Sequence, residues 1–327
     1  MTLDVYGLRI NVEGDWPEIL EQLRLDFAWF ARDVRTADVT VEIRHASPEL
    51  TEFGELEAAF VTPRNVVFQD HERTVIDYVG QAVAVLDRRT RAFCVTGENP
   101  HLVHEAVYLF LLSRVGEHLD AIGRPRVHAL GLVGKQGGVA VMLPSGGGKS
   151  TLALRALRAE GVCLLSEDSP LLDKRGMLYP FPLRIGVNET DAAVLDGQHV
   201  RRIERMEFDP KLLLDVGAFE DRIESEPQPL RHMVLGRRTL GERASLEPIP
   251  RRRLAGPLVR ECVVGVGLYQ GMEFVLQRGM RDVAGKIKPA AVRALCCTMA
   301  ARGACAWSLR LGRDPDANWA ALEPLLD

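Results

Sequence analysis

One stretch of the sequence, residues 137–151, constrains the fold more than any other. It begins with a short apolar run typical of a buried β-strand, continues into the turn Ser145-Gly146-Gly147-Gly148, and ends on Lys149-Ser150-Thr151. A strand, a glycine loop and the start of a helix, in that order, form a P-loop, where backbone N–H groups and the helix N-terminus hold phosphates. The stretch therefore predicts a nucleotide site in an α/β fold.

The residues that end this loop have separate predicted tasks. Ser145 to Thr151 would bind the phosphates, and Lys149 would reach the β- and γ-phosphates of the nucleotide. The Ser150 hydroxyl would complete the ligand shell of a bound Mg²⁺. The sequence departs from the usual pattern at Leu143, where a P-loop has its first glycine. The alternative is a glycine-rich turn in which Lys149 and Ser150 are solvated.

Two adjacent acids follow the next predicted strand. Residues 162–165 form a short apolar run, and Glu167 and Asp168 come directly after it, with Asp168 19 residues beyond Lys149. Ligands collect at the carboxyl ends of strands in open α/β sheets. We expect one acid to hold Mg²⁺ and the other to accept a proton from an attacking hydroxyl. An acidic turn between two strands is the alternative.

Composition places the chain among ordinary globular proteins. It has 327 residues, 46% hydrophobic and 26% charged, with a formal net charge of -4, which gives no sign of a nucleic-acid-binding surface. The six cysteines include no C-x-x-C pair and predict reduced thiols. Neither a signal peptide nor a membrane-spanning run is recognisable, so we expect a cytoplasmic protein that does not bind membranes.

Hydrophobic patterning predicts three regions. Residues 1–100 contain several short alternating runs and one helical pattern, which indicates a β-rich N-terminal domain. Residues 101–250 begin with a helical pattern and contain the glycine loop and the acids, and they are the predicted P-loop core. Residues 251–327 show mostly helical spacing and are expected to pack on that core as a cap.

The chemical elements of the core carry a resemblance. His128-Ala129, residues 143–154 and residues 164–168 resemble the kinase domain of HPr serine kinase/phosphorylase, and more closely the HPr kinase-related proteins. The resemblance covers about residues 127–250. It implies an α/β fold with the P-loop core that this family shares with phosphoenolpyruvate carboxykinase, here with the β-rich N-terminal domain and the helical C-terminal cap.

The same resemblance implies roles for individual residues. Glu167 falls where the family has its general base, Asp168 where it has a metal-binding acid, and Lys149 and Ser150 where it binds phosphate and Mg²⁺. His128 falls where the family has a histidine close to the phosphates; a histidine packed at a strand start is the alternative. ATP and Mg²⁺ are the implied cofactors, and homo-oligomers occur among the relatives.

The sequence thus predicts an ATP-dependent kinase that phosphorylates a hydroxyl, with a serine of a peptide or protein as the acceptor. Catalysis would rest on positioning and charge stabilisation, with Glu167 taking the proton of the acceptor. Two alternatives remain open. The chain could be a nucleotide-binding regulatory or assembly module with little chemistry, or the hydroxyl could belong to a small molecule.

Overall fold

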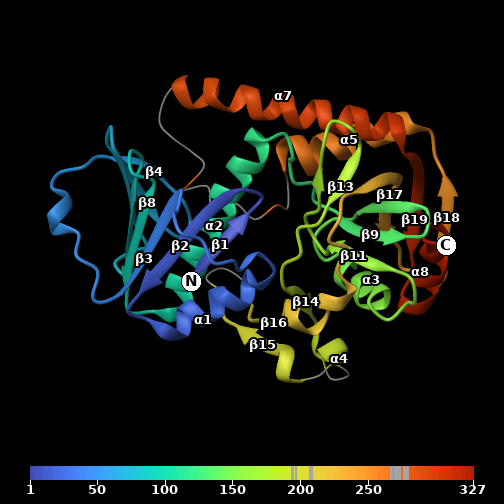
Figure 1. Ribbon diagram of the computed structural model, residues 1–327, viewed down its shortest axis with the longest axis horizontal. Helices are drawn as coiled ribbons and strands as arrows, with labels where there is room; N and C mark the ends of the chain where they lie inside the picture. The colour runs from blue at the N-terminus through green and yellow to red at the C-terminus, as the bar shows by residue number, and fades with distance from the viewer. Residues whose placement is uncertain (193–194, 196, 206–208, 266–267, 269–273, 275–279) are drawn as a thin grey trace. The chain divides into compact units, whose positions relative to one another are not determined.

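The computed structural model describes residues 1–192, 195, 197–205, 209–265, 268, 274 and 280–327. Its contacts divide the chain into two compact units, each built from separate segments of the sequence (Figure 1). The first unit holds residues 1–118, 201–213 and 269–285, and the second holds residues 119–200, 214–268 and 286–327. The contiguous ranges 1–100, 101–250 and 251–327 stay a prediction.

The first unit is organised on an eight-stranded mixed sheet of order β1-β2-β3-β8-β7-β6-β5-β4. The pairs β2–β3 and β3–β8 are parallel, and the remaining neighbours are antiparallel. The strands are β1 (Thr2–Val5), β2 (Leu8–Gly14), β3 (Val39–His45), β4 (Ala58–Val61), β5 (Val66–Gln69), β6 (Arg73–Asp77), β7 (Ala82–Asp87) and β8 (Ala92–Gly97).

Two helices accompany this sheet. Helix α1 (Pro17–Asp26) connects the parallel strands β2 and β3, because such a pair cannot be joined by a tight turn. Helix α2 (Pro100–Ala121) follows β8, and its Phe110 stacks on Phe93 of β8 with ring centroids 4.0 Å apart. Helix α2 thereby packs on the sheet through Phe110.

The second unit contains another eight-stranded mixed sheet. Its path is β11-β9-β10-β17-β13-β12, and β19 lies on β17 with β18 at its outer side. Among the strand pairs described in this sheet, β10–β17 and β17–β19 are parallel and the others are antiparallel. The strands are β9 (Leu130–Gly134), β10 (Gly137–Met142), β11 (Cys163–Ser166), β12 (Leu171–Leu172), β13 (Met177–Tyr179), β17 (Gln228–Arg238), β18 (Ser245–Pro248) and β19 (Cys305–Leu311).

Every residue of β10 is buried, as expected for a strand that is covered on both faces. Alternate residues of β10, Ala140 and Met142, join one core cluster with side chains of the C-terminal helical segments. Those segments are α5 (Ala255–Leu258), the π-helix Val259–Val264 and α7 (Met280–Gly303).

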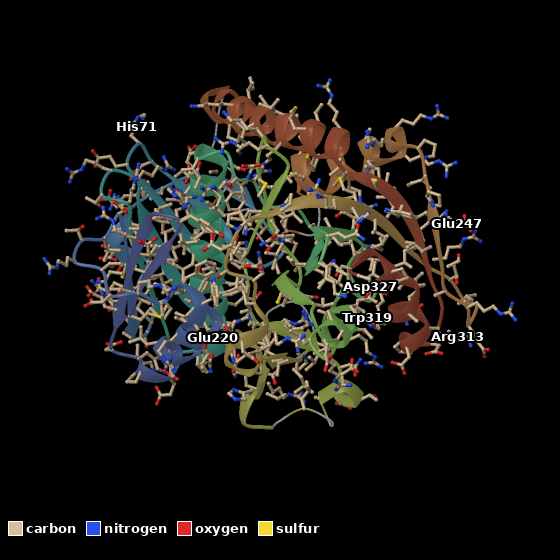
Figure 2. All side chains as sticks on the ribbon, turned by 45° about the vertical axis from the view of Figure 1, so that its right-hand side comes forward. His71, Glu220, Glu247, Arg313, Trp319 and Asp327 are labelled. Carbon is tan, nitrogen blue, oxygen red and sulfur yellow. The ribbon has the colours of Figure 1, made fainter. Side chains whose placement is uncertain are left out.

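Helices α3 (Lys149–Ala156) and α8 (Pro315–Leu322) lie side by side in the second unit (Figure 1). Arg155 Nε of α3 donates to Asp316 Oδ1 of α8 at 2.7 Å. Figure 2 labels Trp319 on α8 and Glu247 on β18; Glu247 accepts from Arg310 of β19 at 2.8 Å. The described chain also contains β14 (Ile185–Val187), α4 (Glu189–Ala192), β15 (Val200–Ile203) and β16 (Lys211–Leu214), together with several single turns of 3₁₀-helix.

The predicted fold class, a P-loop core of the HPr kinase and phosphoenolpyruvate carboxykinase type with a helical C-terminal cap, is wrong. The protein is a mixed α/β protein with 33% strand and 34% helix, and two eight-stranded sheets dominate it. Residues 251–327 include β19, which pairs with β17 on one side and β18 on the other. The C-terminal region therefore completes the sheet. Spacing along the sequence predicts a strand over residues 304–311, but it does not show which strands this segment pairs with.

Candidate functional site

The glycine loop, residues 144–148, connects β10 to α3. Gly148 immediately precedes α3 with φ of 107°, a left-handed conformation that glycine adopts without strain. No side chain caps the N-terminus of α3. Ser145 and Gly146 are exposed, and Thr151 lies half-buried in the first turn of the helix. The loop therefore presents exposed backbone next to uncapped helical N–H groups, an arrangement that suits an anion.

Leu143, the departure from the P-loop pattern, packs into the interior of the unit. Its side chain is 1% exposed and lies against Gly236 of β17, where an added Cβ would be 2.3 Å from Leu143 Cδ2. Gly236 thus leaves the space that the leucine fills. The backbone carbonyl of Leu143 accepts a hydrogen bond from Lys149 Nζ at 3.0 Å. The substitution is accommodated by the neighbouring strand.

Lys149 lies at the centre of a buried charged cluster. Lys149 is 6% exposed, and its Nζ lies 2.7 Å from His128 Nε2 and 3.2 Å from Asp168 Oδ1. His128, just before β9, is 3% exposed, and its Nε2 is 3.2 Å from the same Asp168 oxygen. The structure therefore brings together three residues that the sequence separates by up to 40 positions.

The charges of this cluster shift two pKa values in opposite directions. Burial lowers the pKa of His128, but the hydrogen bond and charge of Asp168 outweigh burial and the Lys149 ammonium, and the pKa lies above its ordinary 6.5. Burial raises the pKa of Asp168, but its hydrogen bond to His128 and the charge of Lys149 outweigh burial, and the pKa lies below 3.8. Asp168 is therefore ionised at neutral pH.

Ser150 and Glu167 form a second contact beside the first. The Ser150 hydroxyl donates to Glu167 Oε1 at 2.6 Å. Glu167 follows β11 and Ser150 belongs to the first turn of α3, so the loop after β11 contacts the N-terminus of α3. The backbone orients both acids toward the start of α3, Asp168 toward Lys149 and Glu167 toward Ser150.

Glu261 is a member of the cluster that sequence reasoning missed. It lies in the π-helix Val259–Val264, is 4% exposed, and its Oε2 is 2.6 Å from His128 Nδ1. A signal was present in the sequence, because Glu261 falls three residues after Leu258, on the side of the predicted helix that carries apolar residues. An acid at such a position requires a buried partner.

Comparison with protein-family models and with curated proteins found no match to this chain. Within the described residues, no helix is long and apolar enough to cross a membrane. The site itself combines a glycine loop, a buried lysine, a histidine and three acids.

Proposed function

We propose that this chain is an ATP-dependent kinase that transfers the γ-phosphoryl group to a hydroxyl, with a serine of a peptide or protein as the acceptor. One observation carries the proposal: the acids after β11 contact the amine and the hydroxyl that begin α3. Phosphoryl transfer needs a cation on the phosphates, oxygen ligands for Mg²⁺ and a base for the acceptor, all within one site. These residues supply each of them.

The phosphates would lie over the glycine loop. The exposed backbone of Ser145 and Gly146, the Gly148 N–H, and the start of α3 at Lys149, Ser150 and Thr151 would provide donors and the positive end of the helix. The Gly147 N–H donates to the Pro144 carbonyl at 2.9 Å and so holds the loop in shape. Lys149 Nζ would bind the β- and γ-phosphates, and His128 would stand behind it. The Leu143 side chain packs against Gly236, so it does not occupy the loop.

The side chains at the site fit Mg²⁺. This ion prefers oxygen ligands and is usually held by one or two carboxylates together with phosphates. Ser150 and Asp168 offer a hydroxyl and an ionised carboxylate, while the described residues contain no group of three or more His, Cys, Asp and Glu side chains that could hold a metal alone. Bound there, Mg²⁺ would neutralise charge on the β- and γ-phosphates.

Glu167 would act as the general base. The acceptor hydroxyl gives its proton to the Glu167 carboxylate as its oxygen forms a bond to the γ-phosphorus. The bond from that phosphorus to the bridging oxygen breaks, and ADP leaves with the bridging electrons. Glu167 already accepts a hydrogen bond from Ser150, so its carboxylate lies at the metal side of the loop. The neighbouring acids therefore divide proton transfer and metal binding.

Calorimetry with Mg²⁺ and the nonhydrolysable analogue AMP-PNP tests the nucleotide site. We expect micromolar binding by the wild type and at least tenfold weaker binding by Lys149→Ala, since that variant loses a charge on the phosphates. Glu167→Gln should bind the analogue like the wild type. No binding by the wild type with any divalent cation would refute the proposal.

Transfer is tested with radiolabelled ATP, a degenerate serine peptide library and, as a universal acceptor, water. Glu167→Gln should lower the rate by about a hundredfold or more, as expected for loss of a general base. Asp168→Asn should instead raise the Mg²⁺ concentration that the reaction requires. If the protein binds nucleotide but Glu167→Gln leaves turnover unchanged, the alternative hypothesis, a nucleotide-binding regulatory or assembly module, would be favoured.

A further inference from the structure

Glu261 has no role in the reaction described above, yet it is a buried acid, and a buried acid needs contacts that compensate for the loss of water. A carboxylate removed from water costs several kcal/mol unless hydrogen bonds or charges compensate it. Glu261 is 4% exposed and belongs to a π-helix, a rare element that is frequently found at functional sites. Glu261 is therefore a carboxylate that is costly to bury and that lies in an unusual backbone conformation.

Two contacts join Glu261 to His128. The side-chain Oε2 lies 2.6 Å from His128 Nδ1, and the backbone carbonyl of Glu261 accepts from the His128 backbone N–H at 3.0 Å. The other carboxylate oxygen, Oε1, accepts from Arg260 Nε at 2.7 Å. The π-helix thus holds both the main chain and the ring of His128.

The chemistry of these contacts determines where the ring carries its proton. The Glu261 carboxylate forms an ion pair with Arg260 through its other oxygen and acts as an acceptor there, so His128 Nδ1 donates to Glu261 Oε2. On the other side of the ring, Nε2 lies 2.7 Å from Lys149 Nζ. Only one proton fits between two nitrogens at that distance, so in the neutral ring Nε2 accepts it from the lysine ammonium; Nε2 donates to Asp168 only when the ring is protonated. Asp168 Oδ1, 3.2 Å from both nitrogens, balances the charge.

We propose that Glu261 is a positioning residue that holds His128 in the Nδ1–H tautomer, so that Nε2 accepts from Lys149 and faces the glycine loop. The consequence for catalysis rests on the proposed function. Glu261 takes no part in bond making. An acid that accepts from Nδ1 in this way disfavours the other tautomer, in which the Nε2–H group and the lysine ammonium would both be donors facing each other.

The experiment measures the ring nitrogens of His128 by ¹⁵N NMR of histidine-labelled full-length protein, at one fixed pH at which the His128 ring is neutral, without nucleotide or Mg²⁺. His128→Gln identifies the signals. We expect the wild type to show a protonated Nδ1 and an accepting Nε2. Glu261→Met, which keeps most of the volume, should give a mixture of tautomers, and Glu261→Gln, whose amide oxygen can accept, should restore the wild-type pattern. Val264→Ala, at an exposed position of the same π-helix, is the control.

The result does not depend on the kinase proposal. A wild-type ring protonated on Nε2 instead of Nδ1, or a wild-type pattern in Glu261→Met, would overturn the role of Glu261 even if phosphoryl transfer is found. If transfer is measured, Glu261→Met should lower kcat by about 10- to 100-fold with Glu261→Gln closer to the wild type, as expected for a residue that supports a functional one. If the expected tautomers appear without any transfer, the positioning role holds and the kinase proposal fails.

Discussion

Replacing Gly236 by alanine should destabilise the second unit, and removing the Leu143 side chain should relieve that effect. The new Cβ would lie 2.3 Å from Leu143 Cδ2 and 2.5 Å from Leu143 Cγ. Carbon atoms in contact lie about 3.5–4.0 Å apart, so the leucine or the strand must move by more than 1 Å. Leu143 is 1% exposed and has no solvent to move into.

The magnitudes follow from core mutations of the same kinds. Gly236→Ala overpacks the site and should cost about 1–3 kcal/mol in the free energy of unfolding. Leu143→Ala leaves a cavity and should cost about 2–5 kcal/mol. In the double variant the new methyl group occupies the vacated space, so the two costs should not add. We expect a favourable coupling energy of about 1–3 kcal/mol.

Urea unfolding followed by tryptophan fluorescence measures these energies, because Trp307 and Trp319 lie in the second unit. Gly256→Ala is the matched control, since nothing lies within 4 Å of an added Cβ at that helical position. The control should be neutral or stabilising by up to about 1 kcal/mol. Costs of Gly236→Ala and Leu143→Ala that add within about 0.5 kcal/mol would refute the packing argument.

Three further predictions concern buried ionisable groups. Asp26 of the first unit is fully buried and bonded to His104 and Arg201, so Asp26→Leu should cost about 3–5 kcal/mol by removing the carboxylate of a buried ion pair; a loss below about 1 kcal/mol in urea unfolding would contradict this. Burial raises the pKa of the Cys296 thiol to about 11, so at pH 8 only about a thousandth of it is thiolate, and the exposed thiol of Cys305 should react with a disulfide reagent much faster; equal rates would be inconsistent with the structure. The His128–Asp168 pair should stabilise the unit fully between pH 3.8 and 6.5. This stabilisation is lost as the pH falls through the lowered Asp168 pKa or rises through the raised His128 pKa. Unfolding midpoints of the wild type and of His128→Phe measure it, and a stability difference that grew above pH 8 would contradict the prediction.

Much of the candidate site could be predicted from the sequence because its parts are local patterns. The apolar run of β10, the glycines and Lys149 follow one another directly, and the acids come one helix and one strand later. The structure brings His128, Lys149 and Asp168 together, as expected if all three serve one site. Which acid serves the metal and which the proton stays a prediction, since Ser150 contacts Glu167 and Lys149 contacts Asp168.

Glu261 could not be placed from the sequence with the same reasoning. It lies 133 positions from His128, and no periodicity links the two. The same holds for the tolerance of Leu143, which depends on a glycine in another strand, and for the placement of β19 between β17 and β18. Each of these is a contact between residues that lie far apart in the chain. The sequence shows which residues could form such a contact, but it does not show which of them meet.

The sequence by itself determined the elements whose causes lie within a few residues: the buried strand, the glycine turn, the helix that starts at Lys149 and the acids that end the next strand. The tertiary structure alone decided the partners: the glutamate that orients His128, the glycine that makes room for Leu143 and the strands that receive the C-terminal segment. Backbone conformation follows from neighbouring side chains, whereas packing selects among many segments that would satisfy the same local pattern. For that reason the predicted helical cap was wrong while the local pattern of the site was found.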